Sequence, residues 1–161
     1  MKHRIVDSPL GPLTLVVTDD GALAALYMAD QRHGPAPDAD LGESDDTAAA
    51  DAVEQLHEYF DGTRTTFDLR LEPAGTDFQR QVWDALRTIP YGATETYGHL
   101  AERIGHPRGT RAVGAATGRN PISIIVPCHR LVGASGGLTG YAGGLDRKRW
   151  LLDLEAGGVL V

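Results

Sequence analysis

Cysteine is nearly absent from this sequence, since Cys128 is the only one among 161 residues. One cysteine allows neither an intramolecular disulfide, nor a pair of thiolate zinc ligands, nor a Cys-x-x-Cys redox motif, and it is typical of a reducing compartment such as the cytoplasm. The chain also lacks the run of about 18 apolar residues that a membrane span requires, and residues 1–7 contain no apolar signal core. We therefore expect neither secretion nor membrane insertion.

Acidic residues are missing from one long stretch, although the net charge is −7. Residues 1–74 carry 5 basic and 15 acidic side chains, whereas residues 75–161 carry 10 basic and 7 acidic ones. No acidic residue lies between Arg103 and Leu145, and that stretch contains five arginines: Arg103, Arg108, Arg111, Arg119 and Arg130. This pattern indicates a surface that binds phosphate groups. A solvated arginine surface is the alternative.

The first half of the chain reads as a small sheet with one helix. Apolar runs between turn residues predict strands at 5–6, 13–17, 23–27 and 66–71. A stretch rich in Pro, Gly and Asp, residues 33–46, predicts an exposed loop. Helical spacing of Val53, Leu56, Tyr59 and Phe60 predicts a helix that ends at Gly62.

The second half reads as mostly helical. Thr76 to Gln79 has the capping-box pattern, and apolar residues at helical spacing continue from it until Pro90. Short helices are then predicted at 97–104, capped by Thr96, and at 110–118. Two short helices around a glycine-containing turn, inside the acid-free stretch, are typical of a helix-turn-helix. With a hydrophobic fraction of 42%, the chain can form two lobes. We place their boundary near residues 73–75, with a scaffold lobe at 1–74 and a second domain at 75–161.

Candidate chemistry gathers at Cys128, His129 and Arg130, which follow an expected buried strand at 122–126 and Pro127. Only a thiolate attacks electrophiles, and a free cysteine with a pKa of about 8.5 is mostly protonated at neutral pH. A neighbouring base or positive charge makes such a thiol reactive, and His129 and Arg130 could supply both. An inert buried cysteine is the alternative interpretation.

Residues 76–155 contain an ordered set of motifs: Ile89-Pro90-Tyr91-Gly92, Thr96-Tyr97, Arg111-Ala112-Val113-Gly114, Asn120-Pro121, Ile125-Val126-Pro127-Cys128-His129-Arg130, Gly140-Tyr141-Ala142-Gly143-Gly144 and Lys148-Arg149-Trp150-Leu151-Leu152 with Glu155. This set resembles the O6-alkylguanine-DNA alkyltransferase family, and Ser8-Pro9-Leu10-Gly11-Pro12-Leu13 resembles its bacterial branch. The resemblance implies an α+β fold, in which an N-terminal ribonuclease-H-like lobe with an antiparallel sheet precedes a helical C-terminal domain with a helix-turn-helix.

The resemblance also implies a suicide transferase that repairs DNA. Cys128 would take the alkyl group from guanine O6 and keep it as a thioether. His129 would draw the thiol proton through a water, and Glu155 would orient the imidazole. Tyr97 would protonate the leaving guanine at N3, and Asn120 would brace the turn around the site. Packing alone is the alternative role for Tyr97, and helix termination for Asn120.

The implied partner is double-stranded DNA with its damaged base flipped out of the stack. Arg111 would fill the gap, while the small residues Ala112, Gly114 and Ala115 on the same helix would let it enter the minor groove closely. Thr117 would be a further DNA-binding residue on this helix. The base pocket would be formed by Pro127, Leu131, Tyr141, Ala142 and Gly143. A plain phosphate contact is the alternative role for Arg111.

Three residues depart from the family pattern: Ala142 replaces a serine, Thr117 an asparagine or methionine, and Leu131 a valine. They leave open which alkyl sizes fit and how tightly DNA is held. The resemblance also leaves open whether O4-alkylthymine is repaired. We expect no metal, no cofactor and no membrane partner, and a monomer in solution that can bind cooperatively along DNA.

Three other functions compete with the transferase. A damage sensor of the same fold typically has tryptophan in place of the nucleophile, which Cys128 argues against. A cysteine hydrolase would turn over repeatedly, and a helix-turn-helix regulator would bind one operator sequence.

Overall fold

The computed structural model describes residues 1–157, and its contacts divide the chain into two compact units. The first unit holds Met1–Ala74 together with Pro121–Ser123. The second holds Gly75–Asn120 and the chain from Ile124 onward. None of the helices in the described part of the chain is long and apolar enough to cross a membrane.

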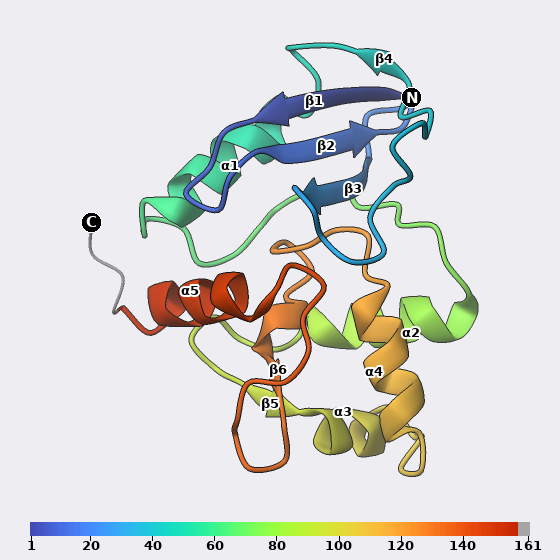
Figure 1. Ribbon diagram of the computed structural model, residues 1–161, viewed down its shortest axis with the longest axis vertical. Coiled ribbons are helices and arrows are strands. Elements are labelled where there is room, and N and C mark those ends of the chain that lie inside the picture. The colour runs from blue at the N-terminus through green and yellow to red at the C-terminus, as the bar shows by residue number, and fades with distance from the viewer. Residues whose placement is uncertain (158–161) are drawn as a thin grey trace. The chain divides into compact units, whose positions relative to one another are not determined.

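The first unit is built on a sheet of four strands in the order β3-β2-β1-β4 (Figure 1). The strands are β1 (Lys2–Val6), β2 (Leu13–Val17), β3 (Leu23–Met28) and β4 (Glu43–Ser44). The first three pair antiparallel as expected, whereas β4 pairs parallel to β1 inside the expected loop at 33–46. Gly42 permits this close approach: its φ is +84°, and a Cβ there would lie 2.2 Å from the Met1 carbonyl oxygen.

Helix α1 (Ala50–Phe60) follows β4. One of its side chains bonds to the backbone at 66–71, where the sequence predicted a strand. That expected strand is wrong. Only Leu71 bridges to β3, at Leu23, while the Gln55 side chain of α1 accepts from the Asp68 backbone N–H at 2.8 Å and donates to its carbonyl at 3.0 Å. A side chain satisfies these backbone groups, so no strand ladder forms there.

The described part of the second unit consists of four α-helices, one 3-10 turn and one short strand pair. The α-helices and strands are α2 (Asp77–Leu86), β5 (Glu95–Thr96), α3 (Tyr97–Arg103), α4 (Thr110–Gly118), β6 (Leu131–Val132) and α5 (Leu145–Glu155). The capping box of α2 is confirmed: the Thr76 hydroxyl accepts from Gln79 N–H, and the Gln79 side chain accepts from Thr76 N–H. Thr96 caps α3 in the expected way.

The expected strand at 122–126 is also wrong. Ile122 alone bridges to Leu26, with a hydrogen bond from Leu26 N–H to the Pro121 carbonyl at 2.8 Å. The chain then turns at Ser123–Ile125, where Ile124 is almost fully buried and has a φ of +72°. A β-branched residue rarely adopts this left-handed conformation. The apolar residues at 122–126 therefore predicted burial correctly, but they did not predict the path of the backbone.

Candidate active site and nucleic-acid interface

Cys128 begins a 3-10 turn, Cys128–Arg130, directly after Pro127 and directly before β6. Its side chain is buried, and burial raises the pKa of the thiol. A hydrogen bond from Asn120 and the positive charge of Lys148 act in the opposite direction. The structure thus places a protonated thiol among groups that stabilise its thiolate.

His129 is fully buried next to Cys128 in this turn. Its Nε2 lies 2.7 Å from Glu155 Oε2, and burial lowers the pKa of the imidazole despite that carboxylate. An ionised carboxylate accepts only, so Nε2 carries the proton of the neutral ring. The other nitrogen, Nδ1, is a buried acceptor without a hydrogen-bond partner among the described residues. The ring is therefore a neutral base with its lone pair available at Nδ1.

Glu155, at the end of α5, forms hydrogen bonds with two side chains, those of His129 and Arg130. Besides His129, it accepts from Arg130 Nε at 2.8 Å and from Arg130 Nη2 at 3.0 Å. Burial acts to raise the pKa of Glu155, but the hydrogen bonds from His129 and Arg130 prevail and lower it to about 2. Arg130 also donates to the Ile89 carbonyl at 2.6 Å. Arg130 therefore pairs with Glu155, and it is not among the groups that act on the pKa of the thiol.

Lys148 supplies the positive charge near the thiol, a role that sequence reasoning missed. Its side chain is fully buried, its Nζ donates to the Thr139 carbonyl at 2.9 Å, and it lies 5.9 Å from the centre of the Tyr97 ring. Burial lowers the pKa of this ammonium, and the Cys128 site acts to raise it. Helical spacing was an available signal, because Lys148, Leu151 and Glu155 share the buried face of α5.

Tyrosines enter the site from two elements. Tyr97, the first residue of α3, is half-buried, and burial raises the pKa of its phenol, which therefore stays protonated at neutral pH. Its hydroxyl lies 3.4 Å from the Gly140 carbonyl oxygen. Tyr141 is buried beside Cys128, and Ala142 and Gly143 follow it partly exposed. Pro127 and Leu131, which flank the turn, are buried.

Asn120 links the end of α4 to the cysteine turn. Its side-chain amide donates to the Val126 carbonyl at 2.9 Å, and it is buried. The same side chain hydrogen-bonds at Cys128 and favours the thiolate there. Asn120 thus does more than end a helix.

Helix α4 presents most, but not all, of the expected DNA-contacting residues on its outer side. Arg111, Ala112 and Ala115 are exposed, and Gly114 is partly exposed. A Cβ at Gly114 would lie 3.9 Å from the Tyr97 ring, so this side of α4 borders the tyrosine. Thr117 is buried and its hydroxyl donates to the Val113 carbonyl at 2.7 Å. The structure therefore does not bring Thr117 to the outer side.

Only part of the arginine stretch is available to phosphates. Arg108, Arg111 and Arg119 are exposed, and none of them pairs with a carboxylate among residues 1–157. Arg103 instead pairs with Glu95 at 2.8 Å, and Arg130 is bound to Glu155. Within the same residues, no group of His, Cys, Asp and Glu side chains could hold a metal ion.

Both parts of the chain match descriptions of one class of protein, the two-domain 6-O-methylguanine DNA methyltransferases. Residues 77–157 match "6-O-methylguanine DNA methyltransferase, DNA binding domain", and residues 1–73 match "6-O-methylguanine DNA methyltransferase, ribonuclease-like domain". The match covers nearly the whole chain.

Individual relatives agree with these matches. The chain is 54% identical over 156 residues to a methylated-DNA–protein-cysteine methyltransferase of Mycolicibacterium paratuberculosis, which covers 96% of this chain and 92% of the relative. A Methanosarcina acetivorans protein of that name is 47% identical over 155 residues, covering 96% and 98%. The crystal structure of Mycobacterium tuberculosis OGT in complex with DNA superimposes with a TM-score of 0.91 at 51% identity, covering 98% and 94%.

The chain belongs to the 6-O-methylguanine DNA methyltransferase family. It is a DNA repair enzyme that acts by alkyl transfer, and the α+β fold expected from the motifs is confirmed.

Proposed function

We propose that this chain repairs duplex DNA directly, by moving the alkyl group of O6-alkylguanine onto the Cys128 sulfur, where it stays. The observation that carries the proposal is the arrangement of three buried side chains, those of Cys128, His129 and Glu155. The imidazole is neutral, its Nε2 is 2.7 Å from the carboxylate, and its Nδ1 is a buried acceptor without a partner among the described residues. This is the arrangement of a general base that serves a thiol.

The proposed reaction exchanges one bond for another. His129 Nδ1 takes the thiol proton through a bridging water, and Glu155 stabilises the imidazolium that forms. The Cys128 thiolate attacks the alkyl carbon in line, so the S–C bond forms while the C–O6 bond breaks. The electron pair passes to the guanine, which takes a proton at N3 from the Tyr97 phenol. A thioether has no good leaving group, so each protein molecule acts once.

The damaged base must leave the stack before its O6 can be attacked, which costs a few kcal/mol. Arg111 on the exposed side of α4 would fill the gap, and the small residues Ala112, Gly114 and Ala115 would let that helix approach the minor groove. The base would lie among Pro127, Leu131, Tyr141, Ala142 and Gly143, with Asn120 bracing the cysteine turn.

We further propose that the protein is a cytoplasmic monomer and that O4-alkylthymine is a second candidate substrate.

The deciding experiment is the intact mass of the protein after mixing with excess duplex DNA containing O6-methylguanine, followed by peptide mapping. We expect the mass of one methylene added per protein molecule, on Cys128, and no addition to a Cys128→Ala variant. A Cys128→Ala variant that still binds the damaged duplex completes the control.

Each other function gives a different result. Damage-selective binding without a mass change would identify a sensor, and repeated turnover without a stable adduct would identify a hydrolase. Preference for one undamaged sequence would identify a regulator. Any of these results would refute the transfer proposal.

A further inference from the structure

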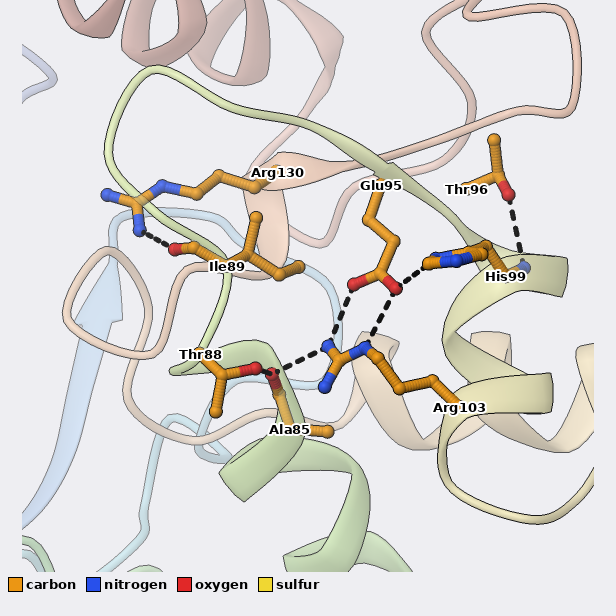
Figure 2. Close-up of polar contacts among 8 residues, drawn as sticks. All are labelled: Ala85, Thr88, Ile89, Glu95, Thr96, His99, Arg103 and Arg130. Carbon is orange, nitrogen blue, oxygen red and sulfur yellow. Dashed lines mark hydrogen bonds and ion pairs between the residues drawn. The ribbon is translucent and has the colours of Figure 1, made fainter.

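A second cluster of a glutamate, an arginine and a histidine lies outside the reacting groups, on β5 and α3 (Figure 2). Glu95 Oε1 accepts from Arg103 Nη2 at 2.8 Å, and Glu95 Oε2 accepts from Arg103 Nε at 2.9 Å. The ring of His99 also contacts Glu95 Oε2. These two hydrogen bonds fix the geometry of the two side chains relative to each other. We call the Glu95–Arg103 pair the clasp.

The clasp joins three elements of the second unit. Glu95 is on β5, and Arg103 is the last residue of α3. Arg103 Nη2 also donates to the Ala85 carbonyl near the end of α2, at 3.1 Å. Figure 2 shows the arginine fork lying between the carboxylate and that carbonyl. Both ends of α3 are therefore fixed relative to α2 by one pair of side chains.

Helix α3 needs such contacts, because it is seven residues long. An isolated helix of that length is unstable in water, so tertiary contacts determine its orientation. The Glu95 side chain is 10% exposed and the Arg103 side chain 35%, which shields the pair from part of the solvent screening. Hydrogen bonds from Arg103 are the main reason that the pKa of Glu95 lies below its usual value.

Tyr97 is the residue that this orientation affects most directly. It lies two positions after Glu95, and it begins α3 immediately after the capping residue Thr96. On the other side, β5 pairs with β6 in the register Glu95 with Leu131 and Thr96 with Val132, directly after the cysteine turn. The clasp and the strand pair together fix the backbone that carries the Tyr97 phenol relative to Cys128.

We propose that Glu95 and Arg103 are positioning residues for alkyl transfer, which act by holding the Tyr97 phenol where the leaving guanine needs its proton. This inference rests on the proposed function, in which Tyr97 is the proton donor. Small displacements of a reacting group can slow a reaction by up to about 100-fold. Loss of the clasp should therefore slow the transfer step and leave DNA affinity nearly unchanged.

The test is a double-mutant cycle between Glu95→Gln and Tyr97→Phe. Single-turnover rates are measured by rapid quench at saturating O6-methylguanine duplex, and DNA dissociation constants by fluorescence anisotropy. We expect Glu95→Gln alone to slow transfer about tenfold, with a dissociation constant within about twofold of the wild type. In the Tyr97→Phe background the same change should alter the rate by less than about twofold, because the group that the clasp positions is gone.

Two further variants keep the test decisive. Glu58→Gln removes a matched ion pair in the first unit, in which Arg64 Nε lies 3.0 Å from Glu58 Oε1 and both side chains are partly exposed. This control variant should leave the rate unchanged. Arg103→Gln opens the clasp from its other end and should reproduce the whole cycle if Glu95→Gln folds poorly. Multiplicative effects of Glu95→Gln and Tyr97→Phe, or an effect confined to DNA affinity, would overturn the proposal.

A spectroscopic measurement separates this inference from the proposed function. With 3-fluorotyrosine in place of the five tyrosines, the Tyr97 fluorine resonance is assigned by its loss in Tyr97→Phe. We expect Glu95→Gln and Arg103→Gln to shift or broaden that resonance, and Glu58→Gln to leave it unchanged. If the wild type transfers no methyl group, the proposed function fails, and the resonance still decides whether the clasp holds Tyr97. An unchanged resonance in both clasp variants would refute the inference.

Discussion

The second unit contains the same three side chains, glutamate, arginine and histidine, in two places with different surroundings. Glu155 with Arg130 and His129 is buried, with side-chain exposures of 1%, 8% and 0%. Glu95 with Arg103 and His99 is nearer the surface, and His99 is 65% exposed. The hydrogen-bond distances are similar, so burial is the main difference between the two clusters.

Burial changes what each histidine can do. At the buried cluster it lowers the pKa of His129, which leaves a neutral ring with an unpartnered acceptor nitrogen. At the surface cluster His99 is 65% exposed, and the Glu95–Arg103 pair joins three elements. The comparison indicates that the buried cluster suits proton transfer, whereas the surface cluster suits positioning.

The largest expected difference between the clusters follows from replacing each glutamate with glutamine. Glu155→Gln leaves Arg130 buried without its counter-charge, which should destabilise the protein by about 3–5 kcal/mol. It also removes the group that stabilises a protonated His129, so transfer should slow about 100-fold or more. Chemical denaturation and single-turnover rates provide the measurements.

Glu95→Gln is the matched control for stability. Partly exposed ion pairs contribute about 0.2–1 kcal/mol, so its free energy of unfolding should fall by no more than about 1 kcal/mol. Equal losses in the two variants would contradict the claim that burial separates the clusters.

The second difference is the dependence of stability on pH. The pKa of Glu155 is about 2 in the folded protein and 4.5 ordinarily. A lowered pKa means that the contribution is complete above pH 4.5 and is lost as the pH falls toward 2. This shift corresponds to about 3 kcal/mol. The free energy of unfolding, measured between pH 6 and pH 2 for the wild type and Glu155→Gln, should show two curves that converge at low pH. Parallel curves would show that Glu155 is not the titrating group.

The third expected effect concerns Lys148, whose charge acts on Cys128 and His129. Lys148→Met removes the charge that favours the Cys128 thiolate, so the pKa of the thiol should rise further. We expect transfer at pH 7 to slow about tenfold for each unit of pKa change, with the rate profile displaced to higher pH. Arg149→Met, an exposed neighbour on α5, is the control and should leave the profile in place. An undisplaced profile in Lys148→Met would contradict the electrostatic role.

Local signals in the sequence predicted much of this unit. The capping box at Thr76–Gln79 and the bounds of α4 follow from residues within one helical turn of each helix end. The roles proposed for Cys128, His129 and Glu155 came from motif order, not from geometry. The path of residues 122–126 could not be predicted, because the backbone conformation of Ile124 depends on packing with distant residues.

The clasp escaped prediction for a similar reason. Glu95 and Arg103 are eight positions apart across a strand and a helix, a spacing that is not an i, i+4 pair. The charge pattern assigned Arg103 to phosphate binding with the other arginines of its stretch, whereas the fold pairs it with a carboxylate. Lys148 was missed for a different reason: a local signal existed, because it shares the buried face of α5 at helical spacing, but its charge argued against burial there.

The smallest expected effect is that of the exposed histidine. His99 of α3 contacts Glu95 of β5 but is 65% exposed, so salt and water screen the interaction. His99→Gln should lower the free energy of unfolding by less than about 0.5 kcal/mol and leave the transfer rate nearly unchanged, because the Arg103 fork remains. His129→Gln removes the proposed base and should slow transfer about 100-fold or more. Denaturation and single-turnover rates measured on the two variants test this directly. A large loss of rate in His99→Gln would mean that the histidine, and not the arginine fork, holds α3 in place.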